Sequence, residues 1–283
     1  MSHAHRQRLT FLPGTCIELV RPGFERGRIR HALFDFDGTL SLIRQGWQEV
    51  MIPMMVEILL QTPGAEDEAT LTGVVQDYVT RLTGGQTIYQ MIQLAQEVKK
   101  RGGRPLDPLA YKRIYHDRLW QRIRGRIAAL EAGQVTPDEA MVPGSRAVLE
   151  ALRARGVRLY LASGTDEAYV HREAQLLGLP PYFEGLYGAL DDYRRYSKRM
   201  VIRRIVEEHA LAGPEFAAFG DGYVEIEDTR RAGGIAVGVA SDEARRRGID
   251  EWKRSRLIEA GAHLIVPDFR EHQALVAYLL GTA

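Results

Sequence analysis

The chain of 283 residues has a single cysteine and no long apolar run, and both shortages narrow its class. Cys16 cannot form an internal disulfide, and residues 1–30 lack the apolar region of a secretory signal. No stretch reaches the ~20 consecutive apolar residues that span a bilayer, because even segment 51–60 contains Pro53 and Glu57. We therefore expect a soluble, cytoplasmic protein that has no membrane partner.

A surplus of charge is also missing. Thirty-eight basic residues stand against thirty-seven acidic ones, so the formal net charge is +1. This balance gives no reason to expect a nucleic-acid partner, and any charge that binds phosphate must be local. The histidines, His3 and His5 included, are scattered and show no zinc-ligand spacing.

The sequence does contain short apolar runs that alternate with amphipathic segments. We interpret the runs as buried parallel strands at 32–34, 157–162, 215–219, 235–239 and 263–266. Between them, segments such as 198–209 place their apolar side chains on one stripe, which is typical of a helix packed on a core. Strand alternating with helix predicts an α/β fold with a doubly wound parallel sheet, similar to a Rossmann fold.

One long segment interrupts this alternation. From about 42 to 139 the pattern is helical throughout, which predicts an all-helical cap domain inserted into the core. Within the N-terminal part, 16–20 has the pattern of an added edge strand. We divide the chain into an N-terminal extension at 1–30, an α/β core at 31–43 and 140–283, and a helical cap at 44–139.

The strongest local signal is segment 31–40, His-Ala-Leu-Phe-Asp-Phe-Asp-Gly-Thr-Leu, in which an apolar strand leads directly into two aspartates. Because alternate strand side chains share a face, Asp35 and Asp37 point the same way while the backbone stays extended. Ligands of open α/β sheets bind beyond the carboxyl ends of the strands, where both acids lie. An isolated Asp-Gly is usually a turn, but here residue type and location together favour a catalytic pair.

With three later segments, this motif makes the chain resemble the haloacid dehalogenase superfamily, whose members share four short motifs in fixed order at strand ends. Those segments are Leu-Tyr-Leu-Ala-Ser-Gly-Thr, Tyr-Ser-Lys-Arg and Phe-Gly-Asp-Gly-Tyr-Val-Glu. Each alone is more often a turn or a surface feature, but together and in order they match the family. The matching positions are Asp35, Asp37 and Thr39, then Ser163, then Lys198, and finally Asp221 and Glu225.

The resemblance implies a phosphatase that hydrolyses a small phosphorylated metabolite. Asp35 would be the nucleophile that forms an aspartyl phosphate, and Asp37 the general acid and base, because phosphoryl transfer needs both roles filled. Ser163 and Lys198 would complete the catalytic set. Phosphate contacts are implied for Thr39, Ser163, Gly164 and Lys198.

The resemblance also implies Mg²⁺ as the cofactor. Magnesium prefers a few hard oxygen ligands and keeps some of its waters. The Asp35 and Asp221 carboxylates and the Asp37 backbone carbonyl can supply such ligands. Glu225 stands where the family more often has aspartate, so its contact with the metal is either direct or through water.

The position of the insert, between the first and second motifs, resembles phosphoglycolate phosphatase-like and β-phosphoglucomutase-like relatives with a helical cap. A closed cap excludes macromolecules and bulk water, which favours a small substrate. Candidate substrate contacts in the cap are Trp47, Gln86, Thr87 and Tyr89. Trp47 also has the spacing of a packed helix face, and Thr83 could instead cap a helix that starts after it.

Two other functions share these residues. A phosphomutase would keep all of them and return the phosphoryl group to a sugar. A non-catalytic protein that binds a phosphorylated metabolite would keep the fold. The sequence leaves the substrate, the choice between hydrolysis and transfer, and the oligomeric state open.

Overall fold

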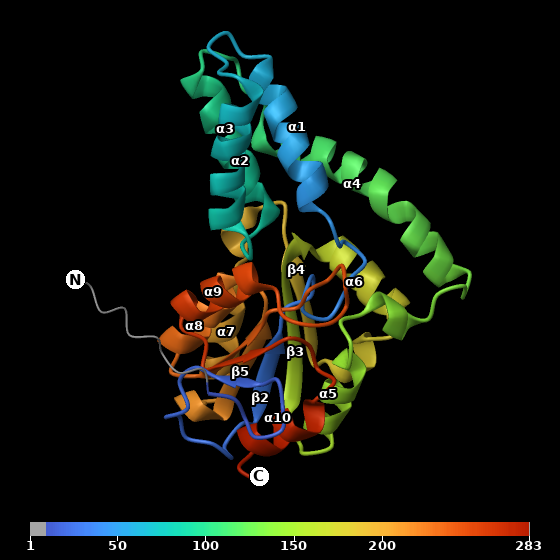
Figure 1. Ribbon diagram of the computed structural model, residues 1–283, viewed down its shortest axis with the longest axis vertical. Helices are drawn as coiled ribbons and strands as arrows, with labels where there is room; N and C mark the ends of the chain where they lie inside the picture. The colour runs from blue at the N-terminus through green and yellow to red at the C-terminus, as the bar shows by residue number, and fades with distance from the viewer. Residues whose placement is uncertain (1–9, 283) are drawn as a thin grey trace, which may run out of the picture.

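The computed structural model describes residues 10–282, so His3, His5 and the first part of the N-terminal extension lie outside the described residues. Within this range, one sheet of seven strands has the order β1-β7-β6-β5-β2-β3-β4 (Figure 1). Only the edge pair β1 and β7 is antiparallel. The strands are β1 (Glu18–Leu19), β2 (His31–Phe34), β3 (Arg158–Asp166), β4 (Gly185–Ala189), β5 (Phe216–Gly220), β6 (Ile235–Val239) and β7 (Leu264–Val266).

Strand order reverses at β2, which has β3 on one side and β5 on the other. Strands β2, β5 and β6 are buried along their whole length, as the apolar runs predict for a sheet covered on both faces. Phe34 and Phe219 are register partners, and their rings stack with centroids 4.4 Å apart. The acids that follow these two strands therefore leave the sheet side by side, at the point where ligands bind in doubly wound folds.

Helices cover both faces of the sheet. The core helices are α5 (Ser145–Arg153), α6 (Glu167–Leu176), α7 (Lys198–Glu208), α8 (Tyr223–Arg231), α9 (Glu251–Ala260) and α10 (His272–Leu279). Neighbouring residues of β2 pack against different helices: Phe34 lies in a cluster with residues of α5, α6 and α10, whereas Leu33 lies in a cluster with residues of α7. Short 3₁₀ turns are η1 (Pro137–Ala140), η2 (Pro180–Tyr182), η3 (Tyr193–Arg195) and η4 (Gly213–Glu215).

A helical insert of four helices lies between β2 and β3 and stands above the carboxyl ends of the strands (Figure 1). Its α1 buries Met51, Met54 and Met55 and continues through Pro53. The helices are α1 (Gln48–Leu60), α2 (Glu68–Leu82), α3 (Thr87–Lys100) and α4 (Pro108–Glu131). The α/β class, the doubly wound and mostly parallel sheet and the helical insert are thus confirmed.

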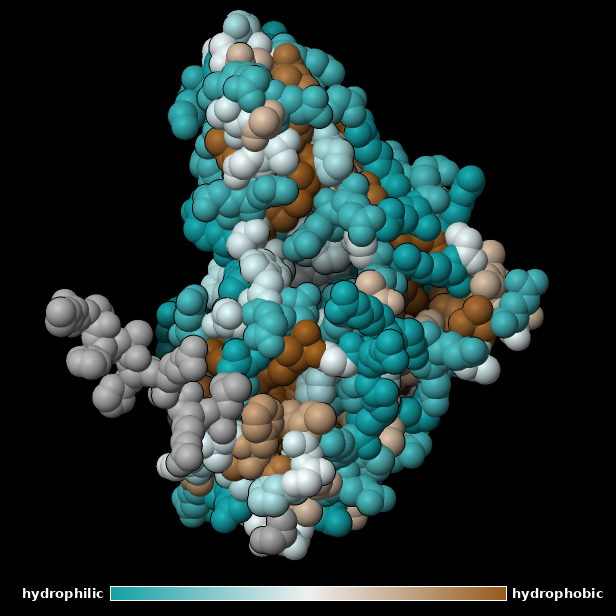
Figure 2. Space-filling model, viewed as in Figure 1, coloured by the Kyte–Doolittle hydropathy of each residue, from teal (hydrophilic) through white to brown (hydrophobic). Residues whose placement is uncertain are grey.

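Hydrophilic residues cover most of the face of the molecule that Figure 2 shows, on the core and on the insert alike. Among residues 10–282, no helix has the length and apolar character needed to cross a bilayer.

Candidate active site

The loop after β2 brings the first acids and a distant one together. The Asp35 N–H donates to the Phe219 carbonyl at 2.9 Å, which extends the β2 and β5 pairing to the strand ends. Gly38 then turns the chain with a φ of 74°, and a side chain at this position would collide with the Asp221 carboxylate. A glycine is required here for both reasons, because the left-handed conformation and the close approach each exclude a Cβ atom.

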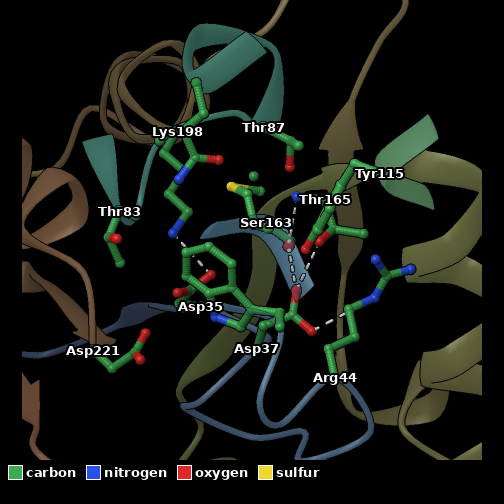
Figure 3. A pocket seen from close by; sticks show the side chains of 16 residues that line it. Asp35, Asp37, Arg44, Thr83, Thr87, Tyr115, Ser163, Thr165, Lys198 and Asp221 are labelled. Atoms are coloured by element: carbon green, nitrogen blue, oxygen red, sulfur yellow. Dashed lines mark hydrogen bonds and ion pairs between the residues drawn. The ribbon is translucent and has the colours of Figure 1, made fainter. Parts of the chain in front are cut away.

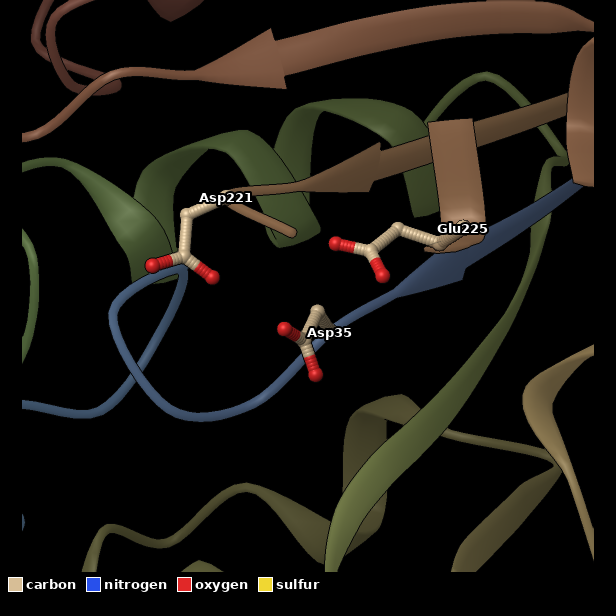
Figure 4. A group of neighbouring side chains, drawn as sticks. All are labelled: Asp35, Asp221 and Glu225. Atoms are coloured by element: carbon tan, nitrogen blue, oxygen red, sulfur yellow. The ribbon is translucent and has the colours of Figure 1, made fainter. Parts of the chain in front are cut away.

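Asp35 lies in a buried ion network (Figure 4). Lys198 Nζ, at the first residue of α7, lies 2.8 Å from Asp35 Oδ1 and 2.9 Å from Glu225 Oε2. Burial raises the pKa of Asp35 well above its usual value, while the Lys198 cation opposes this and the Glu225 and Asp221 carboxylates add to it. Lys198 therefore places a cation beside Asp35 that favours the ionised form of this carboxyl against the effect of burial.

The same network is rich in carboxylates. One oxygen from each of Asp35, Asp221 and Glu225 can be chosen so that the three lie within 4.8 Å of one another. Lys253 Nζ lies 2.9 Å from Asp221 Oδ2 and 2.7 Å from Glu243 Oε1. The four carboxylates and the two lysines leave two formal negative charges without a counterion, which fits a divalent cation bound by oxygen ligands. The carboxylates are Asp35, Asp221, Glu225 and Glu243, and the lysines are Lys198 and Lys253.

Asp37 occupies a different environment from Asp35 (Figure 3). Its Oδ2 atom accepts hydrogen bonds from Thr165 Oγ1 at 2.9 Å and from Ser163 Oγ at 3.3 Å. Its Oδ1 atom lies 3.9 Å from Arg44 Nε and has no hydrogen-bond partner within residues 10–282. Burial raises the pKa of Asp37 to about 6, so this carboxyl can both give and take a proton near neutral pH.

Behind Asp37, a buried ion pair joins the loop after β2 to helix α6. Arg44 donates to both carboxylate oxygens of Glu173, with its shortest bond at 2.7 Å. The guanidinium also lies over the Tyr169 ring, at 5.1 Å from the centroid. No sequence pattern indicated Arg44 or Glu173, because the two residues lie 129 positions apart and neither belongs to a motif.

Asp35, Asp37 and Arg44 line a cavity between the strand ends and the helical insert (Figure 3). Of the residues expected from the sequence, those in the lining are Asp35, Asp37, Trp47, Thr87, Ser163, Gly164, Lys198 and Asp221. Those outside the lining are Thr39, Gln86, Tyr89 and Glu225. Lining residues that the sequence did not single out as contacts are Arg44, Met51, Thr83, Gly84, Gly85, Gln90, Tyr115 and Thr165.

Thr39 and Gln86 instead hold the loops around the cavity. Thr39 Oγ1 accepts a hydrogen bond of 3.0 Å from the Asp221 N–H. Gln86 Nε2 donates to the carbonyls of Tyr196 at 2.7 Å and Tyr193 at 3.1 Å, so the insert is tied to the segment before α7.

The loop between α2 and α3 touches the core through glycines. A Cβ atom on Gly84 would lie 2.9 Å from Gly222 Cα, and one on Gly164 would collide with the Gly85 carbonyl. Thr83 ends α2, and its Oγ1 donates to the Val79 carbonyl at 2.8 Å. The alternative that Thr83 caps a following helix is therefore wrong, since α3 begins after Gln86.

Two acids at adjoining strand ends, a lysine beside one of them and a helical insert over both suit a hydrolase built on an α/β core. Residues 29–233 match the family model of the haloacid dehalogenase-like hydrolases, and the chain belongs to this family. It is 26% identical to a 5'-nucleotidase of Pseudomonas aeruginosa over 212 residues. This aligned region covers 75% of this chain and 83% of that protein.

Solved structures of the family share the fold. A predicted phosphoglycolate phosphatase from Haemophilus somnus superposes with a TM-score of 0.56 at 16% identity, over 90% of this chain and 99% of that chain. A predicted phosphatase from Clostridium acetobutylicum gives a TM-score of 0.57 at 18% identity, over 88% of this chain and 98% of that chain. At these identities the likeness concerns the fold alone.

Proposed function

We propose that the chain is a Mg²⁺-dependent phosphatase that hydrolyses a small phosphorylated metabolite, with Asp35 as nucleophile and Asp37 as general acid and base. The observation that carries the proposal is the contrast between the two acids. Asp35 is held beside the Lys198 cation at 2.8 Å, whereas burial raises the pKa of Asp37 to about 6. Burial raises the pKa of Asp35 as well, but the Lys198 cation beside it favours its ionised form, whereas Asp37 accepts a hydrogen bond from the Thr165 hydroxyl. Two carboxyls with such different partners suit one nucleophile and one proton carrier.

In the first step, an Asp35 carboxylate oxygen forms a bond to phosphorus while the bond from phosphorus to the ester oxygen breaks. Protonated Asp37 gives its proton to the departing alkoxide, so the alcohol leaves neutral. Lys198, Ser163 and the Gly164 N–H, which all border the cavity, would bind the remaining phosphate oxygens.

In the second step, Asp37 is a carboxylate and takes a proton from a water molecule. That water attacks the phosphorus of the aspartyl phosphate, the bond to Asp35 breaks, and inorganic phosphate leaves. Thr165 donates to the Asp37 oxygen at 2.9 Å and would hold the carboxyl in the orientation that both proton transfers need.

The acidic cluster suits a magnesium ion, because it offers hard oxygen ligands and its two unbalanced formal negative charges favour a divalent cation. We propose the Asp35 and Asp221 carboxylates and the Asp37 backbone carbonyl as direct ligands. Glu225 already accepts from Lys198 at 2.9 Å and from the Gly222 N–H at 2.7 Å, so we propose that it faces the ion through water. When bound, Mg²⁺ supplies positive charge that screens the repulsion between Asp35 and an anionic ester.

The proposal is tested by phosphate release from a panel of phosphate esters with Mg²⁺. The panel includes nucleoside 5'-monophosphates, because the relative from Pseudomonas aeruginosa is a 5'-nucleotidase. We expect release by the native chain and none by Asp35→Asn. Asp77→Asn is the matched control, because Asp77 is an exposed acid of α2 outside the cavity. Release that persists in Asp35→Asn would rule out the assignment.

A further inference from the structure

The wall that the helical insert presents to the cavity is uncharged. We call these residues the insert wall: Trp47, Met51, Thr83, Gly84, Gly85, Thr87, Gln90 and Tyr115. Among the described residues that line the cavity, every charged side chain lies outside this wall, in the loop after β2, at the first residue of α7 or directly after β5. The part of a substrate that points away from the phosphorus therefore meets aromatic, thioether, hydroxyl and amide groups.

The two cations of the cavity already have anionic partners. Lys198 lies 2.8 Å from Asp35 and 2.9 Å from Glu225, and it borders the phosphoryl site. Arg44 is bound at 2.7 Å by Glu173, whose side chain is almost completely buried. A second phosphate or carboxylate on a substrate would thus lose its hydration without gaining an unpaired cation, which is strongly unfavourable.

Three polar side chains of the insert wall have no hydrogen-bond partner among residues 10–282. Gln90 and Tyr115 are each only 4% exposed. Over residues 10–282, no hydrogen bond involves the Gln90 carboxamide, the Tyr115 hydroxyl or the Thr87 hydroxyl. Because the polar atoms of these side chains remain accessible from the cavity, a bound ligand can supply the hydrogen bonds that the protein does not.

We propose that Thr87, Gln90 and Tyr115 bind the leaving group, and that the substrate is the monophosphate ester of an uncharged alcohol rich in hydrogen-bonding groups, such as a nucleoside or a sugar. This inference rests on the proposed function and narrows it. Trp47 and Met51 add apolar surface for a ring. The wall disfavours a phosphomutase, because transfer between two hydroxyls of a sugar passes through a bisphosphate whose second phosphate needs a cation.

The test compares matched esters that differ by one added anionic group, with Mg²⁺ present. One pair is a nucleoside 5'-monophosphate and its 3',5'-bisphosphate, and the other is glucose 1-phosphate and glucuronic acid 1-phosphate, which keeps the sugar ring. We expect kcat/KM for the uncharged alcohol to exceed that for the charged one by about 100-fold or more in the preferred pair, because an unpaired charge would be buried. The pair with the higher kcat/KM distinguishes a nucleoside from a sugar.

Variants of α3 test whether Gln90 contacts the leaving group of the substrate. Gln90→Leu should lower kcat/KM for the preferred ester by about 10-fold or more, since a lost buried hydrogen bond leaves a substrate group unpaired. Gln93→Leu is the control, because Gln93 lies on the same helix, bonds Glu97 at 3.3 Å and is absent from the cavity lining. Gln90→Lys should narrow the preference against the charged ester.

Hydrolysis of p-nitrophenyl phosphate distinguishes a wrong substrate class from the absence of phosphatase activity. Its leaving group is an activated phenolate that lacks the hydroxyls of a sugar, so release from it reports the catalytic groups rather than recognition of a natural alcohol. Release from p-nitrophenyl phosphate with equal kcat/KM for both members of each pair would overturn the inference and leave the proposed function intact. An unchanged kcat/KM for the preferred ester in Gln90→Leu would overturn the proposed role of Gln90 and leave the proposed function intact. No release from any ester, p-nitrophenyl phosphate included, would overturn the proposed function and this inference with it.

Discussion

Replacing Glu173 by glutamine tests how the charge around Asp37 is set. The Arg44 and Glu173 side chains are 8% and 2% exposed, so the pair lies almost wholly inside the protein. Glutamine keeps the size of the side chain but removes the negative charge. Among residues 10–282, the carboxylate that then remains near the buried Arg44 cation is that of Asp37, whose Oδ1 lies 3.9 Å from Arg44 Nε. Removing one partner of a buried ion pair costs about 3–5 kcal/mol, because the other charge is left uncompensated.

The same change should move the pH dependence of activity. Burial is the main cause of the raised pKa of Asp37, which is about 6; Arg44 lowers this pKa and Glu173 raises it. Without the Glu173 charge, the pKa of Asp37 falls. The first step needs protonated Asp37, so the decline of kcat/KM with rising pH should begin at a lower pH in Glu173→Gln than in the native chain.

Urea unfolding and a pH profile of kcat/KM measure the two effects. Glu131→Gln is the matched control. Glu131, the last residue of α4, pairs at 3.1 Å with Arg172, which lies next to Glu173 on α6, but both side chains of this pair are 49% exposed. An exposed pair contributes less than about 1 kcal/mol. The double variant Arg44→Met with Glu173→Leu should recover most of the stability, because it buries no unpaired charge. A Glu173→Gln protein as stable as the control, or one with an unmoved profile, would refute the reasoning.

Two further predictions concern the lid and the metal. Gly84→Ala should reduce kcat/KM by about 100-fold, because the added Cβ would lie 2.9 Å from Gly222 Cα and displace the lid. Gly73→Ala, which has open space around it, should only stabilise α2, by about 0.5–1 kcal/mol in urea unfolding, and equal kinetics of the two variants would contradict this account. Mg²⁺ at 100 times its dissociation constant should stabilise the native chain by about 2.7 kcal/mol in thermal unfolding, and Asp221→Asn by less. If the melting temperature of the native chain is the same with a chelator as with Mg²⁺, the proposed metal site is wrong.

The fold class could be predicted because it depends on local patterns. The apolar run at 235–239 coincides with β6, and the runs at 32–34 and 263–266 differ from β2 and β7 by one residue each. Strand β4 did not stand out as an apolar run, because its sequence Gly-Leu-Tyr-Gly-Ala contains two glycines. A buried parallel strand is recognisable from its own residues only when those residues are continuously apolar.

The sequence also determined which acids meet. Asp35 and Asp221 each follow a buried strand, and parallel pairing of β2 with β5 is enough to place such neighbours at one edge of the sheet. The match of both residues to motifs of the family that the sequence resembles was sufficient to propose a shared metal site, for which the cluster with Glu225 now gives a geometric basis.

Only the tertiary structure decided what surrounds these acids. Gln86 and Gln90 are four positions apart, yet Gln86 precedes α3 with extended backbone and binds core carbonyls, whereas Gln90 lies in the helix and borders the cavity. Arg44 meets Glu173 across 129 positions. Periodicity tells which face of a helix is buried, but the partner across that face depends on how separate helices pack, and no local pattern in the sequence records that.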